Sequence, residues 1–349
     1  MVLWESRNRK KKSAAVYSGQ SRAAKRRLPI ETPVTLRPNG MSRGADEDDD
    51  VVRDCGAGPS RSRCSDVRLL NLRLPPESVY ANKLNALVLD WAGTTVDFGS
   101  LAPARTLQQV FARVNILLTD AEVRRDMGLP KKDHIREILS IPRVRDAWHA
   151  LRGHGPTLSD VDDVYQQFIP LQLSCLAEHS SLIPGVLASV QRFRERGLKI
   201  GSTTGYPRGM LDLLLENSAR AGFQPDCSLS PEDVGGGRPE PFMLYENAVR
   251  MRVYPLASIA KIGDTPADIH EGLNAGVWSI GVAGTGNGIG LSYDDFQALS
   301  SSERESRLEG ARHELERAGA HYVVDTLSEL DPVLDEIETR LRSRQPSQG

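Results

Sequence analysis

Two aspartates each end a short apolar run, in segments that lie far apart in the chain. Asp90 follows NALVL and precedes the turn WAGTT, and Asp264 follows IAKIG. An apolar run that ends in an acid is typical of a buried strand in an α/β protein, whose ligand sites lie at the carboxyl ends of the strands. Two such carboxylates favour Mg²⁺, which prefers oxygen ligands. We expect Asp268, in the same GDTPAD segment as Asp264, to support this site.

Other polar residues at predicted strand ends suit a phosphate group. Thr204 and Gly205 end the segment LKIGSTTG, and Arg238 lies in GGGRPEP. Arg238 would offset the charge of a bound anion and Thr204 would donate its hydroxyl, while backbone N–H groups around Ala92 and Gly205 would cradle phosphate oxygens. Asp90 could then attack phosphorus, which splits a difficult displacement into two steps. The position two residues after Asp90, where a second acid is expected, holds Ala92.

The pattern of elements around these residues predicts an α/β fold. Residues 84–90 are almost continuously apolar, as in a parallel sheet covered on both faces. From residue 183 onward strands alternate with helices, which predicts an open parallel Rossmann-like sheet with right-handed crossovers. Residues 100–182 read as helices only, so we expect an inserted all-helical cap domain above the carboxyl ends of the strands. The catalytic core would comprise residues 82–99 and 183–345.

Composition excludes some classes of protein. The chain has 349 residues, a formal net charge of −2 and 39% hydrophobic residues. A charge so close to zero gives no field that would favour nucleic acid or an anionic membrane, and no apolar stretch approaches the roughly 20 residues that span a bilayer. The four cysteines lack a CxxC spacing and are typical of unpaired thiols in a reducing compartment. We therefore expect a cytoplasmic protein that acts on a small molecule.

The first 81 residues differ from the rest of the chain. Residues 1–27 carry nine Lys and Arg against one Glu, and the segment GADEDDD at 44–50 reverses the sign. Such a stretch cannot bury enough apolar surface to offset its ordering entropy, so we expect a disordered extension. A nuclear or nucleic-acid signal and a transit peptide are alternatives, and the acidic block argues against the transit peptide. We favour an extension without a catalytic role.

Five segments in one order resemble a known family. They are DWAGTTVDFG, MGLPKKDH, KIGSTTGY, GRPEP and KIGDTPADIHEG. The strand-end Asp, the strand-end Thr, the basic loop residue and GDTxxD are similar to the four signatures of the haloacid dehalogenase superfamily. Together the segments resemble the phosphonoacetaldehyde hydrolase, or phosphonatase, family over residues 82–340. The resemblance implies a haloacid dehalogenase-like core and one Mg²⁺ per subunit, held by Asp90, Asp264 and the Ala92 carbonyl.

The resemblance also implies residue roles in the helical segment. Lys131 matches the family's Schiff-base lysine, and Met127 matches a residue that lines the substrate pocket. A place in the first turn of a helix and the neighbouring Lys132 should both lower the pKa of Lys131. If the helix starts one residue later, Lys132 points inward instead. His134, three residues beyond Lys131 on the same helical face, would shuttle protons.

These roles predict hydrolysis of the P–C bond of phosphonoacetaldehyde to acetaldehyde and phosphate, in the degradation of 2-aminoethylphosphonate. The leaving group is a carbanion that no carboxylic acid can protonate, so an imine on Lys131 takes the place of the acid missing at Ala92. The base that hydrolyses the aspartyl phosphate is not identified by the sequence. The family further implies a homodimer formed through the cap.

Two other functions stay open. One is a phosphomonoesterase or phosphomutase of the same fold acting on a small phosphate ester, which Ala92 disfavours because an alkoxide leaving group needs a proton. The other is a non-catalytic phosphate-binding protein, which the filled catalytic positions disfavour. The segment GTGNGIG at 284–290 does not fit GxGxxG in any register, and we interpret it as a flexible loop.

Overall fold

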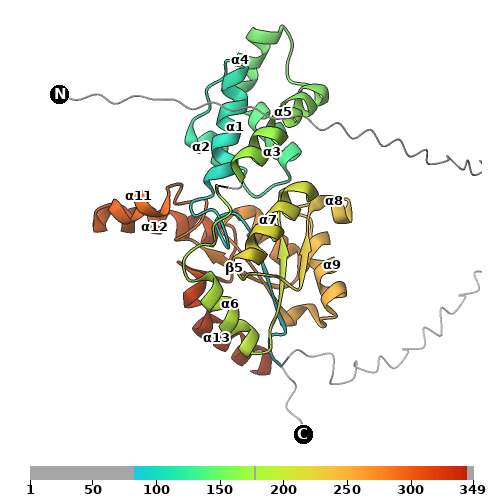
Figure 1. The fold of residues 1–349 in the computed structure, drawn as a ribbon, viewed down its shortest axis with the longest axis vertical. Helices are drawn as coiled ribbons and strands as arrows, with labels where there is room; N and C mark the ends of the chain where they lie inside the picture. The colour runs from blue at the N-terminus through green and yellow to red at the C-terminus, as the bar shows by residue number, and fades with distance from the viewer. Residues whose placement is uncertain (1–81, 177, 344–349) are drawn as a thin grey trace, which may run out of the picture. The chain divides into compact units, whose positions relative to one another are not determined.

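The computed structural model describes residues 82–176 and 178–343, so the predicted N-terminal extension lies outside the described part. The centre of the described fold is a parallel sheet (Figure 1). It has six strands in the order β3-β2-β1-β4-β5-β6. The strands are β1 (Ala86–Leu89), β2 (Lys199–Thr203), β3 (Cys227–Leu229), β4 (Ile259–Gly263), β5 (Trp278–Val282) and β6 (Tyr322–Val324). The prediction of an open parallel sheet is confirmed.

The register of the central strands brings the predicted site residues to one edge. Leu89 of β1 lies opposite Ser202 of β2 and Ile262 of β4. Because the strands are parallel, the residues that follow each of them emerge at the same end of the sheet. Asp90 and Asp264 therefore lie at one edge, although 174 positions separate them in the chain.

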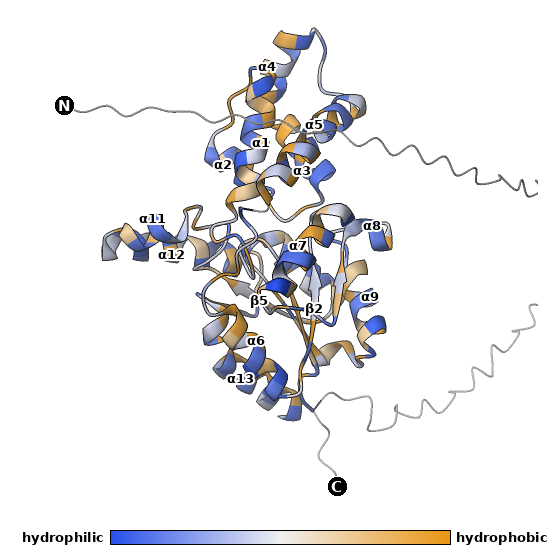
Figure 2. Ribbon diagram, in the orientation of Figure 1, coloured by the Kyte–Doolittle hydropathy of each residue, from blue (hydrophilic) through white to orange (hydrophobic). Residues whose placement is uncertain are grey.

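Helices cover both faces of the sheet. Leu87 and Leu89 belong to one apolar cluster, with residues of α6 (Val186–Glu195), α7 (Arg208–Arg220) and α13 (Leu330–Ser343). Ala86 and Val88 belong to a second, with residues of α9 (Phe242–Met251). Along α6 and α13, hydrophobic and hydrophilic residues alternate (Figure 2), as expected for helices with one buried face. Burial on both faces explains the continuous apolar run of β1.

The remaining core elements complete these layers. α10 (Pro266–Ala275) follows β4, and α12 (Ser301–Arg317) shares an apolar cluster with it. The shorter elements are α8 (Pro231–Val234), α11 (Tyr293–Ala298), and the 3₁₀ helices η2 (Leu256–Ser258) and η3 (Leu327–Glu329). The final helix, α13, buries one face that consists of Leu330, Leu334, Ile337 and Leu341.

Between β1 and α6 the described chain forms helices only, which we call the cap. These helices are α1 (Leu101–Arg113), α2 (Asp120–Arg124), α3 (Lys131–Ser140), α4 (Pro142–Arg152) and α5 (Leu158–Leu176). α5 packs against both α1 and α3. A capping box forms at the start of α2, where the Thr119 side chain accepts from the Glu122 N–H and the Glu122 side chain accepts from the Thr119 N–H. None of the described helices is long and apolar enough to cross a membrane.

Two chain segments join the cap to the core. The first passes through Asp97, Gly99 and Ser100, all with positive φ, and the second pairs with it where Leu182 bridges Val96. Asp97 is buried, and its carboxylate accepts from the Ala102 N–H at the start of α1 at 2.9 Å. Asp and Ser rarely adopt positive φ, so this short connection has a strongly constrained backbone.

Candidate active site

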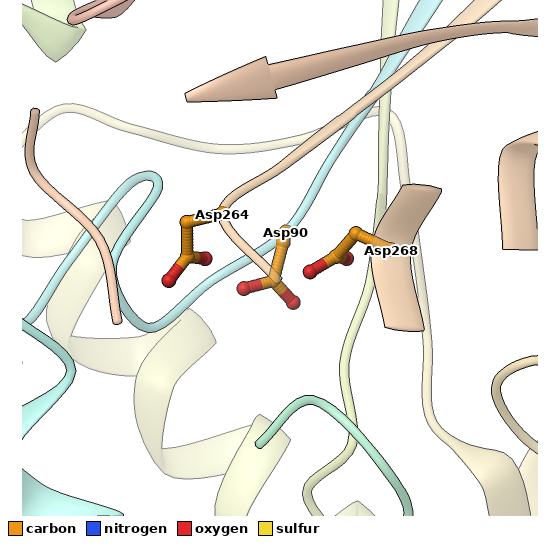
Figure 3. Close-up of side chains that lie close together, drawn as sticks. All are labelled: Asp90, Asp264 and Asp268. Atoms are coloured by element: carbon orange, nitrogen blue, oxygen red, sulfur yellow. The ribbon is translucent and has the colours of Figure 1, made fainter. Parts of the chain in front are cut away.

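The three aspartates predicted at the sheet edge lie together (Figure 3). Asp90, Asp264 and Asp268 each place one carboxylate oxygen within 4.8 Å of the others. All three are buried, which is unusual for carboxylates unless they are paired or bind a cation. Asp268 also completes the capping box of α10, because its Oδ2 accepts from the Thr265 N–H at 3.3 Å. A capping role and a role at the site are therefore combined in one residue.

Asp264 is fixed through both of its carboxylate oxygens. Thr94 donates its hydroxyl to Oδ1 at 3.0 Å, and the Asn287 N–H donates to Oδ2 at 2.7 Å. The turn after Asp90 approaches so closely that a Cβ on Gly93 would lie 2.2 Å from Oδ2 of Asp264. Gly93 has a φ of +92°, so this position needs glycine for both conformation and space.

Arg238 contacts protein carboxylates on three sides. Its Nη2 donates to Asp90 at 2.6 Å, its Nη1 lies 2.9 Å from Asp268, and its Nε donates to Glu271 at 3.0 Å. The guanidinium is almost completely buried. The sequence assigned Arg238 to a bound phosphate; this role stays a prediction, and Arg238 lines the pocket beside Asp90.

A second buried cation, Lys261, was missed by the sequence reasoning. It lies in the middle of β4, with its Nζ 2.8 Å from Asp268, 3.3 Å from Glu271 and 2.9 Å from the hydroxyl of Thr203. A lysine within the otherwise apolar strand IAKIG was a usable signal, because a buried ammonium requires ionic partners. Glu271 supplies one, and nothing in its helical segment distinguished it from a surface residue.

The network at the sheet edge fits a divalent cation. Among the described residues around the three aspartates, four buried carboxylates face two buried cations, Arg238 and Lys261. Lys131, which is buried in the same pocket, adds a third positive charge when protonated, so carboxylates remain in excess by one. Burial raises the pKa of Asp264 well above its usual range, and Asp90 and Asp268 raise it further. A cation between Asp90 and Asp264 would keep both ionised, and an all-oxygen set suits Mg²⁺.

Lys131, the first residue of α3, points into a pocket that Asp90 also lines. It is 5% exposed, its Nζ lies 3.9 Å from Met127 Sδ, and it stands 5.2 Å from the centre of the Tyr206 ring. Burial lowers the pKa of Lys131 to about 8, with Asp90 opposing the shift and Arg238 adding to it. Burial is thus the largest cause of the lowered pKa of Lys131, which the sequence led us to expect from the helix start and from Lys132.

Lys132 points away from the pocket. Its Nζ lies 2.6 Å from Asp162 and 5.2 Å from the centre of the Tyr165 ring, and its side chain is about half exposed. α3 therefore begins in the register that turns Lys131 inward.

His134 is completely buried one turn beyond Lys131. Its Nε2 lies 2.9 Å from the Val123 carbonyl, which can only accept, so Nε2 carries the proton. Burial lowers the pKa of His134 well below its usual range, and the charge of Lys131 adds to this effect. The ring is then neutral and its Nδ1, which has no hydrogen-bond partner among the described residues, is a free proton acceptor.

One pocket brings the core and cap residues together. Its lining comprises most of the predicted site residues and some that were not predicted: Asp90, Ala92, Ser100, Pro103, Met127, Gly128, Lys131, Thr204, Gly205, Tyr206, Arg238 and Thr265. His134, Asp264 and Asp268 lie behind this lining. Tyr206 was overlooked although it directly follows the threonine-glycine pair; its ring packs against Lys131, and its hydroxyl accepts from Gln172 at 3.3 Å.

The cap lies directly on the core around this pocket. A Cβ on Gly205 would lie 2.6 Å from the carbonyl oxygen of Leu129, and a Cβ on Gly128 would lie 2.3 Å from the hydroxyl of Thr265. The absence of side chains at these two glycines lets the loop before Lys131 approach the sheet edge. The structure therefore has the cap closed over Asp90.

Known proteins resemble both the sequence and the fold of this chain. A family model described as haloacid dehalogenase-like hydrolase matches residues 84–276. The phosphonoacetaldehyde hydrolase of Syntrophobacter fumaroxidans is 42% identical over 75% of this chain and 95% of its own length. A Clostridioides difficile protein named bifunctional phosphonoacetaldehyde hydrolase/aminoethylphosphonate transaminase is 39% identical over 75% of this chain and 41% of its own length.

A solved structure supports the same relationship. The crystal structure of a phosphonoacetaldehyde hydrolase-like protein from Oleispira antarctica superimposes with a TM-score of 0.74 at 38% identity. The superposition covers 76% of this chain and 96% of the Oleispira antarctica chain.

Proposed function

The chain belongs to the haloacid dehalogenase-like hydrolases and, within them, to the phosphonoacetaldehyde hydrolase family, and we propose that it hydrolyses phosphonoacetaldehyde to acetaldehyde and phosphate. The observation that carries this proposal is a buried amine, Lys131, in one pocket with the strand-end carboxylate Asp90. Ala92 stands where an acid would protonate an alkoxide, and a P–C bond does not need that acid.

The first step would make the P–C bond breakable. The neutral amine of Lys131 adds to the aldehyde carbon, and loss of water gives an imine, which is protonated before cleavage. His134, whose ring stays neutral, would relay protons in these steps through Nδ1, the ring nitrogen without a hydrogen-bond partner among the described residues. The pKa of about 8 leaves an appreciable fraction of Lys131 neutral near pH 7. The protonated imine then provides a sink for the electrons of the P–C bond.

The second step would transfer the phosphoryl group. A carboxylate oxygen of Asp90 attacks phosphorus, and the P–C electrons pass into the iminium to give an enamine. Arg238 holds Asp90 at 2.6 Å and fixes its direction of attack. Water then cleaves the aspartyl phosphate to release phosphate. Protonation of the enamine carbon and hydrolysis of the imine release acetaldehyde and restore Lys131.

A Mg²⁺ ion would be held by Asp90, Asp264 and the carbonyl of Ala92, with Asp268 in support. When bound, the ion would neutralise the negative charge that otherwise opposes the approach of a phosphonate to a carboxylate. Thr204 and Gly205, which line the same pocket, would bind the phosphonate oxygens, and Met127 would contact the carbon end beside Lys131. The charge excess at the sheet edge supports this arrangement.

The cap and core would act as separate domains, with the cap spanning residues 100–182 and the core spanning 82–99 and 183–345. The chain passes between the two parts only at the paired segments around Val96 and Leu182, which supports a division at this point. Closure would expel water from around Lys131 and bring it to the substrate on Asp90.

A homodimer and a cytoplasmic location are also part of the proposal. Cys175 and Cys227 are free thiols, which are typical of a reducing compartment. The predicted dimer contact is the cap, where Leu151 and Leu158 are exposed. A second candidate surface is α9, which exposes Phe242, Tyr245 and Val249 on one face. Sedimentation of Leu158→Glu and Val249→Glu proteins would distinguish the two surfaces, because only the true contact yields a monomer when charged.

The substrate would arise by transamination of 2-aminoethylphosphonate, which exchanges an amine for the aldehyde that Lys131 requires. The bifunctional name of the Clostridioides difficile relative supports this sequence of reactions.

The test compares phosphonoacetaldehyde with small phosphate esters as substrates, using purified protein and Mg²⁺. We expect phosphate release from phosphonoacetaldehyde, with inactivation when borohydride is added together with this substrate. Hydrolysis of small phosphate esters without borohydride inactivation would instead support a phosphomonoesterase. Phosphate binding without turnover of either class would support a non-catalytic protein.

A further inference from the structure

The loop after β5, residues 284–291, has no role in the reaction proposed above. Its sequence suggested a flexible loop, yet most of it is buried against the active site. Thr285 donates its hydroxyl to the carbonyl of Gly93 at 2.7 Å, and its backbone carbonyl accepts from the Gly99 N–H at 2.8 Å. The loop therefore joins the turn after Asp90 to the first connection between core and cap.

The same loop holds Asp264. The backbone N–H of Asn287 donates to Oδ2 of Asp264 at 2.7 Å. A Cβ on Gly286 would lie 2.2 Å from the Cβ of Asp264, so the loop backbone lies directly on this side chain. Any shift of Asn287 would change the hydrogen bonding of a carboxylate that we assign to Mg²⁺.

The side chain of Asn287 faces the cap. Its Oδ1 accepts from Nη1 of Arg124 at 3.2 Å, and its Nδ2 donates to the carbonyl oxygen of Arg124 at 3.1 Å. Nη1 of Arg124 also donates to the carbonyl of Gly99 at 2.9 Å, and a Cβ on Gly290 would lie 3.0 Å from its Nε. Arg124 is the last residue of α2, and its side chain is 11% exposed.

We propose that Arg124 and Asn287 form a latch through which closure of the cap positions Asp264, so that cap closure and Mg²⁺ binding favour each other. Asn287 is the coupling element because its side chain contacts the cap while its N–H contacts Asp264. The inference rests on the proposed metal role of Asp264. Opening the cap would remove both side-chain partners of Asn287, and the glycines on either side would let the loop relax.

Thermodynamic linkage makes the coupling reciprocal. If the closed cap raises the affinity for Mg²⁺ by some factor, Mg²⁺ must stabilise the closed cap by the same factor. The latch would thereby favour the closed cap, with Lys131 in the pocket beside Asp90, when Mg²⁺ is bound to the carboxylates. Arg124 and Asn287 are positioning residues in this account, since neither lines the substrate pocket.

The first experiment measures Mg²⁺ affinity by titration calorimetry in the full chain. The test variant is Arg124→Gln and its matched control is Arg125→Gln. Among the described residues, the Arg125 side chain donates hydrogen bonds to Asp126 and to the Glu137 carbonyl, both within the cap. We expect the control to bind as the wild type does and Arg124→Gln to bind about tenfold more weakly. Equal affinities in all three proteins would overturn the latch alone. Absence of binding in all three, wild type included, would overturn the metal role and the latch with it.

The second experiment separates a latch from a general loss of structure. Asn287→Ala keeps the N–H to Asp264 but removes both side-chain hydrogen bonds with Arg124, so it should weaken Mg²⁺ binding as Arg124→Gln does. The loss in the double variant should be smaller than the sum of the two single losses, because both changes remove the hydrogen bond between Arg124 Nη1 and Asn287 Oδ1. In hydrogen exchange, Mg²⁺ should slow exchange across residues 120–140 in the wild type and not in either variant. Additive losses, or Mg²⁺ protection that survives in Arg124→Gln, would overturn the proposal.

Discussion

The sheet edge and the cap pocket hold their reactive groups in opposite ways. At the sheet edge, Asp90, Asp264 and Asp268 are each fixed by hydrogen bonds or ion pairs to groups on other segments. In the cap pocket, Lys131 has no ion pair among the described residues, and its neighbours are a thioether and an aromatic ring. Asp90 and Asp268 are paired with buried cations and Asp264 accepts two hydrogen bonds, whereas the amine that must lose its proton is surrounded by weakly polar groups.

The difference follows from what each group must do. A nucleophilic carboxylate and its metal-binding neighbour work in the ionised form. Arg238 favours this form at Asp90, burial raises the pKa of both carboxyl groups, and a bound cation would offset that effect. An amine attacks an aldehyde only when neutral, and burial without a close counter-ion favours the neutral form. The comparison predicts that the two regions respond differently to substitution and to pH.

The largest effect is expected from Lys131→Arg. The variant keeps a positive charge but loses the nucleophilic amine, so P–C cleavage should fall by more than about a thousandfold. Mg²⁺ binding should stay within about twofold of the wild type, because the metal carboxylates are untouched. Lys132→Arg is the matched control and should keep nearly full turnover. Substantial turnover in Lys131→Arg would remove the basis for the imine.

A second large effect is expected at the sheet edge. Lys261→Met leaves Asp268 and Glu271 with one buried cation instead of two, and breaking a buried ionic network costs about 3–5 kcal/mol. Lys132→Met, which breaks the exposed pair with Asp162, should cost about 1 kcal/mol or less. Urea unfolding monitored by circular dichroism measures both values. Equal losses would mean that the network does not carry the stability we assign to it.

The sequence predicted the paired strand ends well, because each strand must end at the same edge of a parallel sheet. Asp90, Thr204 and Asp264 could be placed in this way, and so could the all-helical insertion. Tertiary contacts that join unlike segments could not: Glu271 looks like a surface acid, and Arg124 looks like a solvated helix end. The glycines of GTGNGIG suggested mobility. Glycines also occur where a backbone must pass close to another side chain, as Gly286 does at Asp264, and the sequence does not distinguish the two cases.

The smallest effect expected concerns pH. Lys131 is protonated below its pKa of about 8, so the neutral fraction rises with pH until about that value and then levels. The rate of borohydride trapping at saturating aldehyde should therefore rise about tenfold between pH 6 and 7 and little above pH 9. A trapping rate that still rises steeply above pH 9 would indicate an amine with an ordinary pKa.

The most direct test of the account is to map the borohydride-reduced adduct in Asp90→Asn protein. Without the carboxylate the P–C bond should stay intact, so mass spectrometry should find a phosphonoethyl group on Lys131, whereas the wild type should also carry an ethyl group. An adduct on another lysine, or an ethyl adduct that forms as readily in Asp90→Asn as in the wild type, would contradict the division of work between Lys131 and Asp90.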